Sequence, residues 1–195
     1  MEILLAYIGV ALMVGVSGTA SAFGITMTAN ATIGAIKKDM SIFGNCVILS
    51  AIPTTQGLYG FASFYLISGF LTEGITMLQS VAILCSGLAV AAVCLFTALK
   101  QAEICTTGII AMGNGHKVFG NTLIIAVFPE LYAILGVALV FLVSGMIGEP
   151  VVLSAELVEE GVTNSIEFFD GLIEFIKGVA NSAEGLADTA VSVVQ

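Results

Sequence analysis

Long apolar stretches separated by short polar breaks dominate this sequence of 195 residues. Hydrophobic residues make up 58% of the chain and charged residues only 10%, which excludes an ordinary soluble globular domain. Each stretch exceeds the roughly 20 residues that a helix needs to cross a bilayer. The alternation over about ten residues that is typical of a transmembrane β-barrel is missing. The pattern therefore predicts an all-α membrane protein.

Four transmembrane helices are expected, and they cover about residues 4–33, 42–70, 77–112 and 119–147. Glu2 stands where a signal peptide would carry positive charge, so we expect the first helix to be retained. The first and third breaks contain lysines, namely Lys37, Lys38 and Lys117. Positive charge marks cytoplasmic loops. These loops are therefore predicted to be cytoplasmic, with both termini outside.

The two halves of the chain repeat. The repeated motif is a phenylalanine, a proline ten residues later and a glycine seven residues after that. It occurs as Phe43, Pro53 and Gly60, and again as Phe119, Pro129 and Gly136. This spacing indicates a duplication. We expect two tandem helical hairpins in the same orientation, one over residues 1–75 and one over residues 76–147.

The net charge of −9 is unevenly distributed. Residues 1–147 are nearly neutral, whereas residues 148–195 carry nine acidic residues against Lys177. In this acidic extension Asn164 and Glu167 have the spacing of a capping box, and apolar residues follow at helical spacing, so an extra amphipathic helix is expected. The chain contains no arginine and no basic patch, which argues against nucleic acid as a partner.

A single carboxylate, Glu130, lies in the middle of the last apolar stretch. An acid at bilayer depth costs about 2.5–3.5 kcal/mol on insertion scales, so its presence indicates a function. If the chain turns near His116, Gln101 and Glu130 lie at the same depth, about 20 Å from the turn at 1.5 Å per residue. Thr55 and Gln56 reach a comparable depth in the second stretch.

These side chains offer carboxylate, amide and hydroxyl oxygens, the ligands that hard cations prefer. Pro53 and Pro129 disturb the backbone hydrogen bonds nearby, so a free backbone carbonyl is also expected. A bare proton would not need so many oxygens, and the pattern favours a cation site inside the membrane. The alternative for the threonine and the glutamines is a purely structural role, as hydrogen bonds between helices.

The same residues resemble a known family. Residues 51–61 read Ala-Ile-Pro-Thr-Thr-Gln-Gly-Leu-Tyr-Gly-Phe, and residues 130–136 read Glu-Leu-Tyr-Ala-Ile-Leu-Gly. Both runs are similar to the proteolipid ring subunit (K subunit) of bacterial V-type ATPases, above all to its sodium-translocating members. The resemblance covers about residues 1–147. It implies a membrane ring of identical subunits, a stator subunit that supplies an arginine, and contact with the central-stalk subunits.

The resemblance also implies the residues of a Na⁺ site. They are the backbone carbonyl of Ile52 and the side chains of Thr55, Gln56, Gln101 and Glu130, with Tyr59 supporting the carboxylate through a hydrogen bond. In this family one half of the duplication keeps its acid, and Thr54 stands at the corresponding place in the first half.

The expected function is a non-catalytic rotor subunit that carries Na⁺ across the cell membrane. No glycine-rich phosphate-binding loop occurs in the sequence. The same rotor carrying H⁺ is the nearer alternative. A four-helix structural membrane protein, or a small carrier that acts without ATP, is the more remote one, and it predicts no ring.

Overall fold

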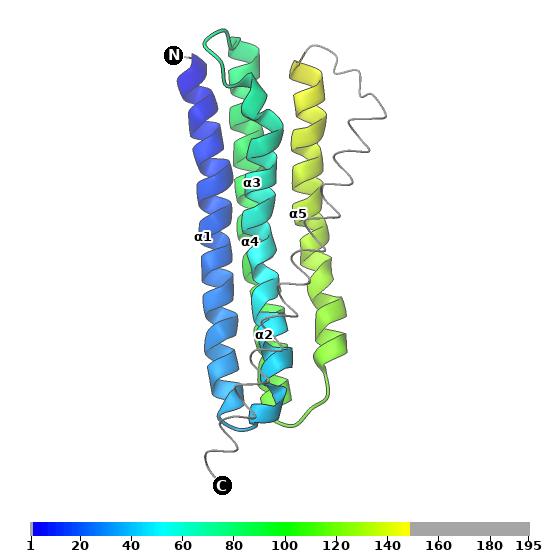
Figure 1. Ribbon diagram of the computed structural model, residues 1–195. Coiled ribbons are helices and arrows are strands. Elements are labelled where there is room, and N and C mark those ends of the chain that lie inside the picture. Colours follow the sequence, from blue (N-terminus) through cyan, green and yellow to red (C-terminus); the bar gives the residue numbers. More distant parts are fainter. Residues whose placement is uncertain (1, 149–195) are drawn as a thin grey trace.

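The computed structural model describes residues 2–148, and these form a bundle of helices that lie side by side (Figure 1). The long helices are α1 (Glu2–Ile36), α4 (Met77–Gly113) and α5 (Phe119–Ile147). The remaining span consists of α2 (Phe43–Ala51) and α3 (Thr55–Ile67). Since the described part of the chain contains no strand, the predicted all-α fold is confirmed. The helix expected in the acidic extension lies outside the described residues.

The second span is the one that is broken. The 3₁₀ helix η2 (Ile52–Thr54) separates α2 from α3, whereas α1, α4 and α5 are each long and apolar enough to cross a membrane. Pro53 lies in η2, where its missing N–H and its ring disturb the preceding turn. Pro129 lies at the equivalent place inside α5, and that helix continues through it.

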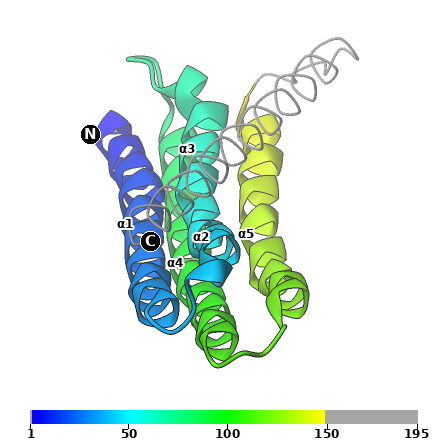
Figure 2. The same cartoon turned by 60° about the horizontal axis from the view of Figure 1, so that its bottom comes forward.

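The chain forms two hairpins in the same orientation, as the repeat predicted. The start of α1, the α3–α4 connection and the end of α5 lie at one end of the bundle, and the other two turns lie at the opposite end (Figures 1 and 2). The short 3₁₀ helices η1 (Met40–Ile42) and η3 (Ser68–Phe70) belong to the connections. Lys38 Nζ donates a hydrogen bond of 2.7 Å to Asn114 Oδ1, which joins the first and third turns.

The closest contact in the bundle is between α1 and α4. A Cβ atom on Gly9 would lie 2.7 Å from the carbonyl oxygen of Ile83, and one on Gly87 would overlap the carbonyl of Gly9. The two backbones therefore touch, which only glycine permits at these positions. Close approach through small residues is how helices associate in lipid.

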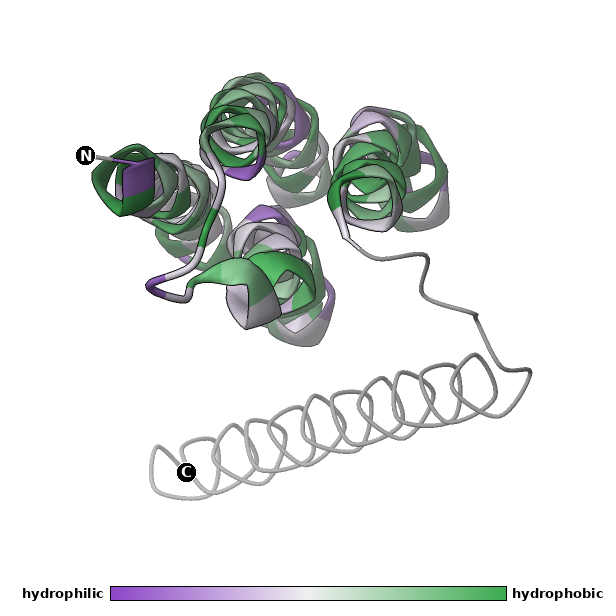
Figure 3. Ribbon diagram, turned by 90° about the horizontal axis from the view of Figure 1, so that it is seen from above, coloured by the Kyte–Doolittle hydropathy of each residue, from purple (hydrophilic) through white to green (hydrophobic). Residues whose placement is uncertain are grey.

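The outside of the bundle is apolar. Seen from above, most of the ribbon is coloured as hydrophobic, with hydrophilic residues scattered among the helices (Figure 3). Large apolar side chains point outward, among them Leu78 with 73% and Met146 with 81% of its surface exposed. Such a surface suits lipid or neighbouring subunits, and the chain is a membrane protein.

Candidate ion site

Glu130 is held by donors from two other helices. The carboxylate lies on α5 directly after Pro129 and is half-buried. Tyr59 of α3 donates its hydroxyl to Oε1 at 2.8 Å, and Gln101 of α4 donates Nε2 to Oε2 at 3.3 Å. Both oxygens thus have a partner, and the hydrogen bond to Gln101 confirms that these two residues lie at one level.

Gln101 is the central residue of this cluster. It is fully buried, and its Nε2 also donates to the carbonyl of Ala126 at 2.8 Å. Its Oε1 accepts a hydrogen bond of 2.9 Å from Nε2 of Gln56, which is fully buried on α3. The structure therefore joins Gln56, Gln101, Glu130 and Tyr59 in one hydrogen-bonded row across α3, α4 and α5.

One acceptor oxygen of this row has no donor. Oε1 of Gln56 is buried and has no hydrogen-bond partner among the described residues. An unsatisfied buried acceptor costs about 1–3 kcal/mol, so such an atom calls for a ligand. Together with the carboxylate and the amide oxygen of Gln101, it forms an environment that a hard cation would stabilise.

Ile52 and Thr55 lie at the break between α2 and α3, next to Gln56 in the chain. The Ile52 carbonyl accepts both the N–H of Thr55 and, at 3.1 Å, the Thr55 hydroxyl. The Ile52 carbonyl thus already has partners, because the 3₁₀ turn brings the Thr55 N–H into reach, and its role as an ion ligand stays a prediction. No hydrogen bond links Thr55 to Gln56, Gln101 or Glu130 in the described part of the chain.

Two contributors to this region were not expected from the sequence. The Ser21 hydroxyl on α1 accepts the N–H of Gly57 at 2.8 Å and donates to the Thr54 carbonyl at 3.3 Å, so it satisfies backbone groups next to the break. The Ala126 carbonyl fixes the Gln101 amide. Ala126 lies one turn before Glu130 on the same face of α5, so helical spacing could have indicated its place in the site. No feature of the sequence indicated Ser21.

Thr54, which stands in the first hairpin where Glu130 stands in the second, forms no part of the cluster. Its hydroxyl donates to the carbonyl of Ala51 in its own turn at 2.6 Å. The first hairpin therefore holds a satisfied hydroxyl at the place where the second holds an acid.

Comparisons with known proteins agree with this arrangement. The family model for the C subunit of ATP synthase matches the chain twice, at residues 8–67 and 84–143. The chain is 30% identical over 140 residues to A-type ATP synthase subunit K of Methanocaldococcus jannaschii, which covers 72% of this chain and 61% of that protein. It is 33% identical over 126 residues to V-type sodium ATPase subunit K of Enterococcus hirae, which covers 65% of this chain and 81% of that protein.

This chain thus spans about three fifths of the length of the archaeal relative. Subunits of this family are membrane rotor subunits that are not themselves catalytic, and they form rings of identical copies in ATP synthase complexes. One family match falls on each hairpin, as expected for a duplicated proteolipid. The chain belongs to the ATP synthase C-subunit family, as a proteolipid of the c or K type.

Proposed function

We propose that this chain forms the membrane rotor ring of a V-type ATPase and that each copy binds Na⁺ at Glu130 and carries it across the membrane. One observation carries the proposal. A half-buried carboxylate lies in a row with two buried amides, and one amide oxygen of that row, Oε1 of Gln56, has no partner among residues 2–148. The name of the E. hirae relative, a sodium ATPase subunit, supports the same ion.

The proposed ligands are oxygen atoms from the three helices and from the break in the second span. They are the Glu130 carboxylate, the side-chain oxygens of Gln56, Gln101 and Thr55, and the carbonyl of Ile52. The Thr55 hydroxyl and the Ile52 carbonyl are adjacent at 3.1 Å. A turn of the hydroxyl hydrogen would free the Thr55 oxygen and the second lone pair of the Ile52 carbonyl for a cation, while that carbonyl keeps the Thr55 N–H. Tyr59 acts as a positioning residue, because its hydroxyl holds Oε1 of Glu130.

Charge neutralisation explains how such a site can move through a membrane. A bare carboxylate facing hydrocarbon is costly, and a bound cation removes most of that cost. The loaded copy can therefore pass along the lipid as the ring turns. An arginine of the stator subunit would then pair with Glu130 and release the ion, since this chain has no arginine of its own.

The lysines and the repeat support a proposal for how the hairpins are oriented in the membrane. We propose that residues 1–75 and 76–147 form the two hairpins and that the turns with Lys37, Lys38 and Lys117 are cytoplasmic. The bond between Lys38 and Asn114 supports a common side for the first and third turns. These turns would contact the central-stalk subunits, and the start of α1 would lie outside.

The test is the reaction of Glu130 with a hydrophobic carbodiimide, which attacks free carboxyl groups. We expect Na⁺ to slow the labelling of Glu130 at fixed pH, while K⁺ at the same ionic strength has a much smaller effect. Glu130→Gln should remove the label and so identify its position. If Na⁺ gives no protection at any pH while acid pH still controls labelling, the rotor carries H⁺ instead. Migration of the gently solubilised protein as a monomer would support the structural or small-carrier alternative.

A further inference from the structure

The second span is broken at Pro53, whereas α5 continues through the equivalent Pro129. Both prolines lack an N–H and crowd the preceding turn, so the proline alone does not explain the difference. The cause must lie in the neighbouring helix, which is α1 for Pro53 and α4 for Pro129. The two hairpins can be compared residue by residue, because the family matches begin at residues 8 and 84 and are thus offset by 76 residues.

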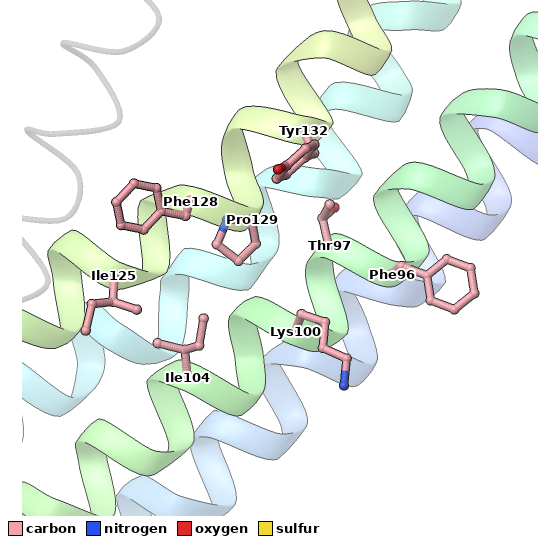
Figure 4. A pocket seen from close by; sticks show the side chains of 8 residues that line it. All are labelled: Phe96, Thr97, Lys100, Ile104, Ile125, Phe128, Pro129 and Tyr132. Carbon is pink, nitrogen blue, oxygen red and sulfur yellow. The ribbon is translucent and has the colours of Figure 1, made fainter.

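Helix α1 presents a glycine to Pro53. A Cβ atom on Gly24 would lie 2.7 Å from Cβ of Pro53, so the buried proline packs directly on the α1 backbone. In the second hairpin Lys100 stands in place of Gly24. Lys100 and Pro129 line an open groove of about 380 Å³ between α4 and α5 (Figure 4). Pro129 therefore faces a gap where Pro53 faces a helix backbone.

Helix α1 also bonds to the backbone that follows Pro53. The Ser21 hydroxyl accepts the N–H of Gly57 at 2.8 Å and donates to the Thr54 carbonyl at 3.3 Å. The corresponding residue of α4 is Thr97, and its hydroxyl donates to carbonyls of its own helix at 2.8 and 3.3 Å. Within residues 2–148 no hydrogen bond joins Thr97 to α5, so the backbone after Pro129 lacks this support.

The backbone before the proline is bonded in both hairpins and so does not distinguish them. The Ser50 carbonyl accepts the Thr28 hydroxyl of α1 at 3.1 Å. The carbonyl of the equivalent Ala126 accepts the side chain of Gln101 at 2.8 Å. The contacts that differ between the hairpins are therefore the one at the proline and the one after it.

The break changes the direction of the side chains that follow it. Three residues of a 3₁₀ helix complete one turn, whereas three residues of an α-helix cover about 300°. The side chains of α3 are therefore rotated by about 60° relative to those of a continuous helix. Among them are Gln56, which bonds to Gln101 at 2.9 Å, and Tyr59, which bonds to Glu130 at 2.8 Å. Both bonds from α3 to the candidate ion site thus depend on the break.

We propose that Ser21 and Gly24 of α1 are positioning residues of the ion site, an inference that rests on the proposed function. They lie three residues apart on the same buried face of α1 and hold η2 in its 3₁₀ turn. The turn directs Gln56 and Tyr59 into the site. Helix α1 supplies no ligand, yet it sets how tightly the cation is held. Each hairpin then contributes one half of the site, the first the break and the second the acid.

The variant Gly24→Ala tests the contact with Pro53 in native membranes. The new Cβ atom lies 2.7 Å from the proline, so the proline must shift. We expect the Na⁺ concentration that half-protects Glu130 from carbodiimide to rise by a factor of about three to ten. Gly34→Ala is the matched control on the same helix, because a Cβ atom on the exposed Gly34 meets no atom of residues 2–148 within 4 Å.

A double variant separates positioning from general destabilisation. If Gly24 acts through α3, its substitution should weaken Na⁺ protection much less in a Tyr59→Phe background, where the bond to Glu130 is already missing. Coupled residues give such non-additive effects, whereas independent ones give additive effects. Fully additive losses in Gly24→Ala and Tyr59→Phe would therefore overturn the proposal.

Amide hydrogen exchange of the solubilised protein reports on the break without any ion. Ser21→Ala removes the acceptor of the Gly57 N–H, so peptides that cover residues 50–60 should exchange faster. Ser21→Thr keeps a hydroxyl and should restore both slow exchange and protection by Na⁺. Exchange and half-protecting concentrations that are the same in Ser21→Ala, Gly24→Ala and the unmodified protein would overturn this inference alone. Failure of Na⁺ to protect the unmodified protein would instead refute the proposed function.

Discussion

Tyr59 of the first hairpin and Glu130 of the second are joined by a hydrogen bond of 2.8 Å. The bond crosses from α3 to α5, at the level where Gln101 also reaches the carboxylate. The duplicated halves therefore meet at the one acid that the last span holds. Because Tyr59 occupies Oε1 and Gln101 approaches Oε2, the orientation of the carboxylate is set before any ion arrives.

Tyr59→Phe is expected to weaken Na⁺ binding. A hydrogen bond to a charged group contributes about 1.5–3 kcal/mol, and each 1.4 kcal/mol is tenfold in affinity. The Na⁺ concentration that half-protects Glu130 from carbodiimide should therefore rise by about tenfold or more. Tyr65→Phe is the matched control, since Tyr65 lies on the same helix and is 74% exposed. An unchanged half-protecting concentration in Tyr59→Phe would show that Tyr59 has no positioning role.

Gln101→Leu tests the choice between Na⁺ and H⁺. The change removes an amide oxygen from the proposed site, together with the bonds to Ala126 and Glu130. Protection by Na⁺ should be lost, while Glu130 still reacts with carbodiimide. Gln79→Leu is the control, because Gln79 also lies on α4 but bonds to the Ile147 carbonyl at 2.9 Å, near the end of α5. Full protection in Gln101→Leu would mean that this amide is not an ion ligand.

Much of the fold was predictable because its determinants are local. Apolar length predicts the spans, and the repeated spacing predicts two hairpins in one orientation. The 3₁₀ turn that breaks the second span at η2 was not predictable. Pro53 and Pro129 are equivalent in sequence, yet only the first lies in a 3₁₀ turn. Pro53 packs on Gly24 of α1, and the backbone next to Pro53 is hydrogen-bonded to Ser21 of α1. Neither contact can be predicted from the residues around the proline.

The sequence predicts the depth of the site along the helices but not the hydrogen bonds within it. Counting residues from the turn places Gln101 beside Glu130, because helical rise is constant. The direction of a side chain depends on its neighbours in space. The hydrogen bond from the Thr55 hydroxyl to the Ile52 carbonyl of its own turn could therefore not be foreseen. Helical spacing places Ala126 one turn before Glu130, but the bond of its carbonyl to Gln101 depends on how α4 approaches α5.

Ser21→Ala should destabilise the broken span. The change removes the 2.8 Å partner of the partly buried Gly57 N–H, and the loss of a typical hydrogen bond costs about 0.5–1.5 kcal/mol. We expect a lower unfolding temperature of the solubilised protein and weaker protection of Glu130 by Na⁺. Thr19→Ala is the control, because the exposed Thr19 hydroxyl bonds, among residues 2–148, only to the Gly15 carbonyl of its own helix. Equal unfolding temperatures for the two variants would show that Ser21 does not support the break.

Glu130→Gln should abolish ion transport and spare assembly. Glutamine has nearly the same shape, and its carbonyl oxygen can still accept from Tyr59 or Gln101, so the row of hydrogen bonds is largely kept. Glutamine lacks the negative charge of glutamate. It therefore cannot bind a cation tightly, and it cannot cancel the charge of the ion while the copy faces lipid. ATP-driven uptake of radioactive Na⁺ into inverted vesicles measures transport, and mobility of the solubilised ring on a native gel measures assembly. Glu73→Gln is the matched control, because Glu73 is exposed in the turn before α4 and should transport like the unmodified protein. Continued Na⁺ uptake by Glu130→Gln would exclude this carboxylate as the carrier.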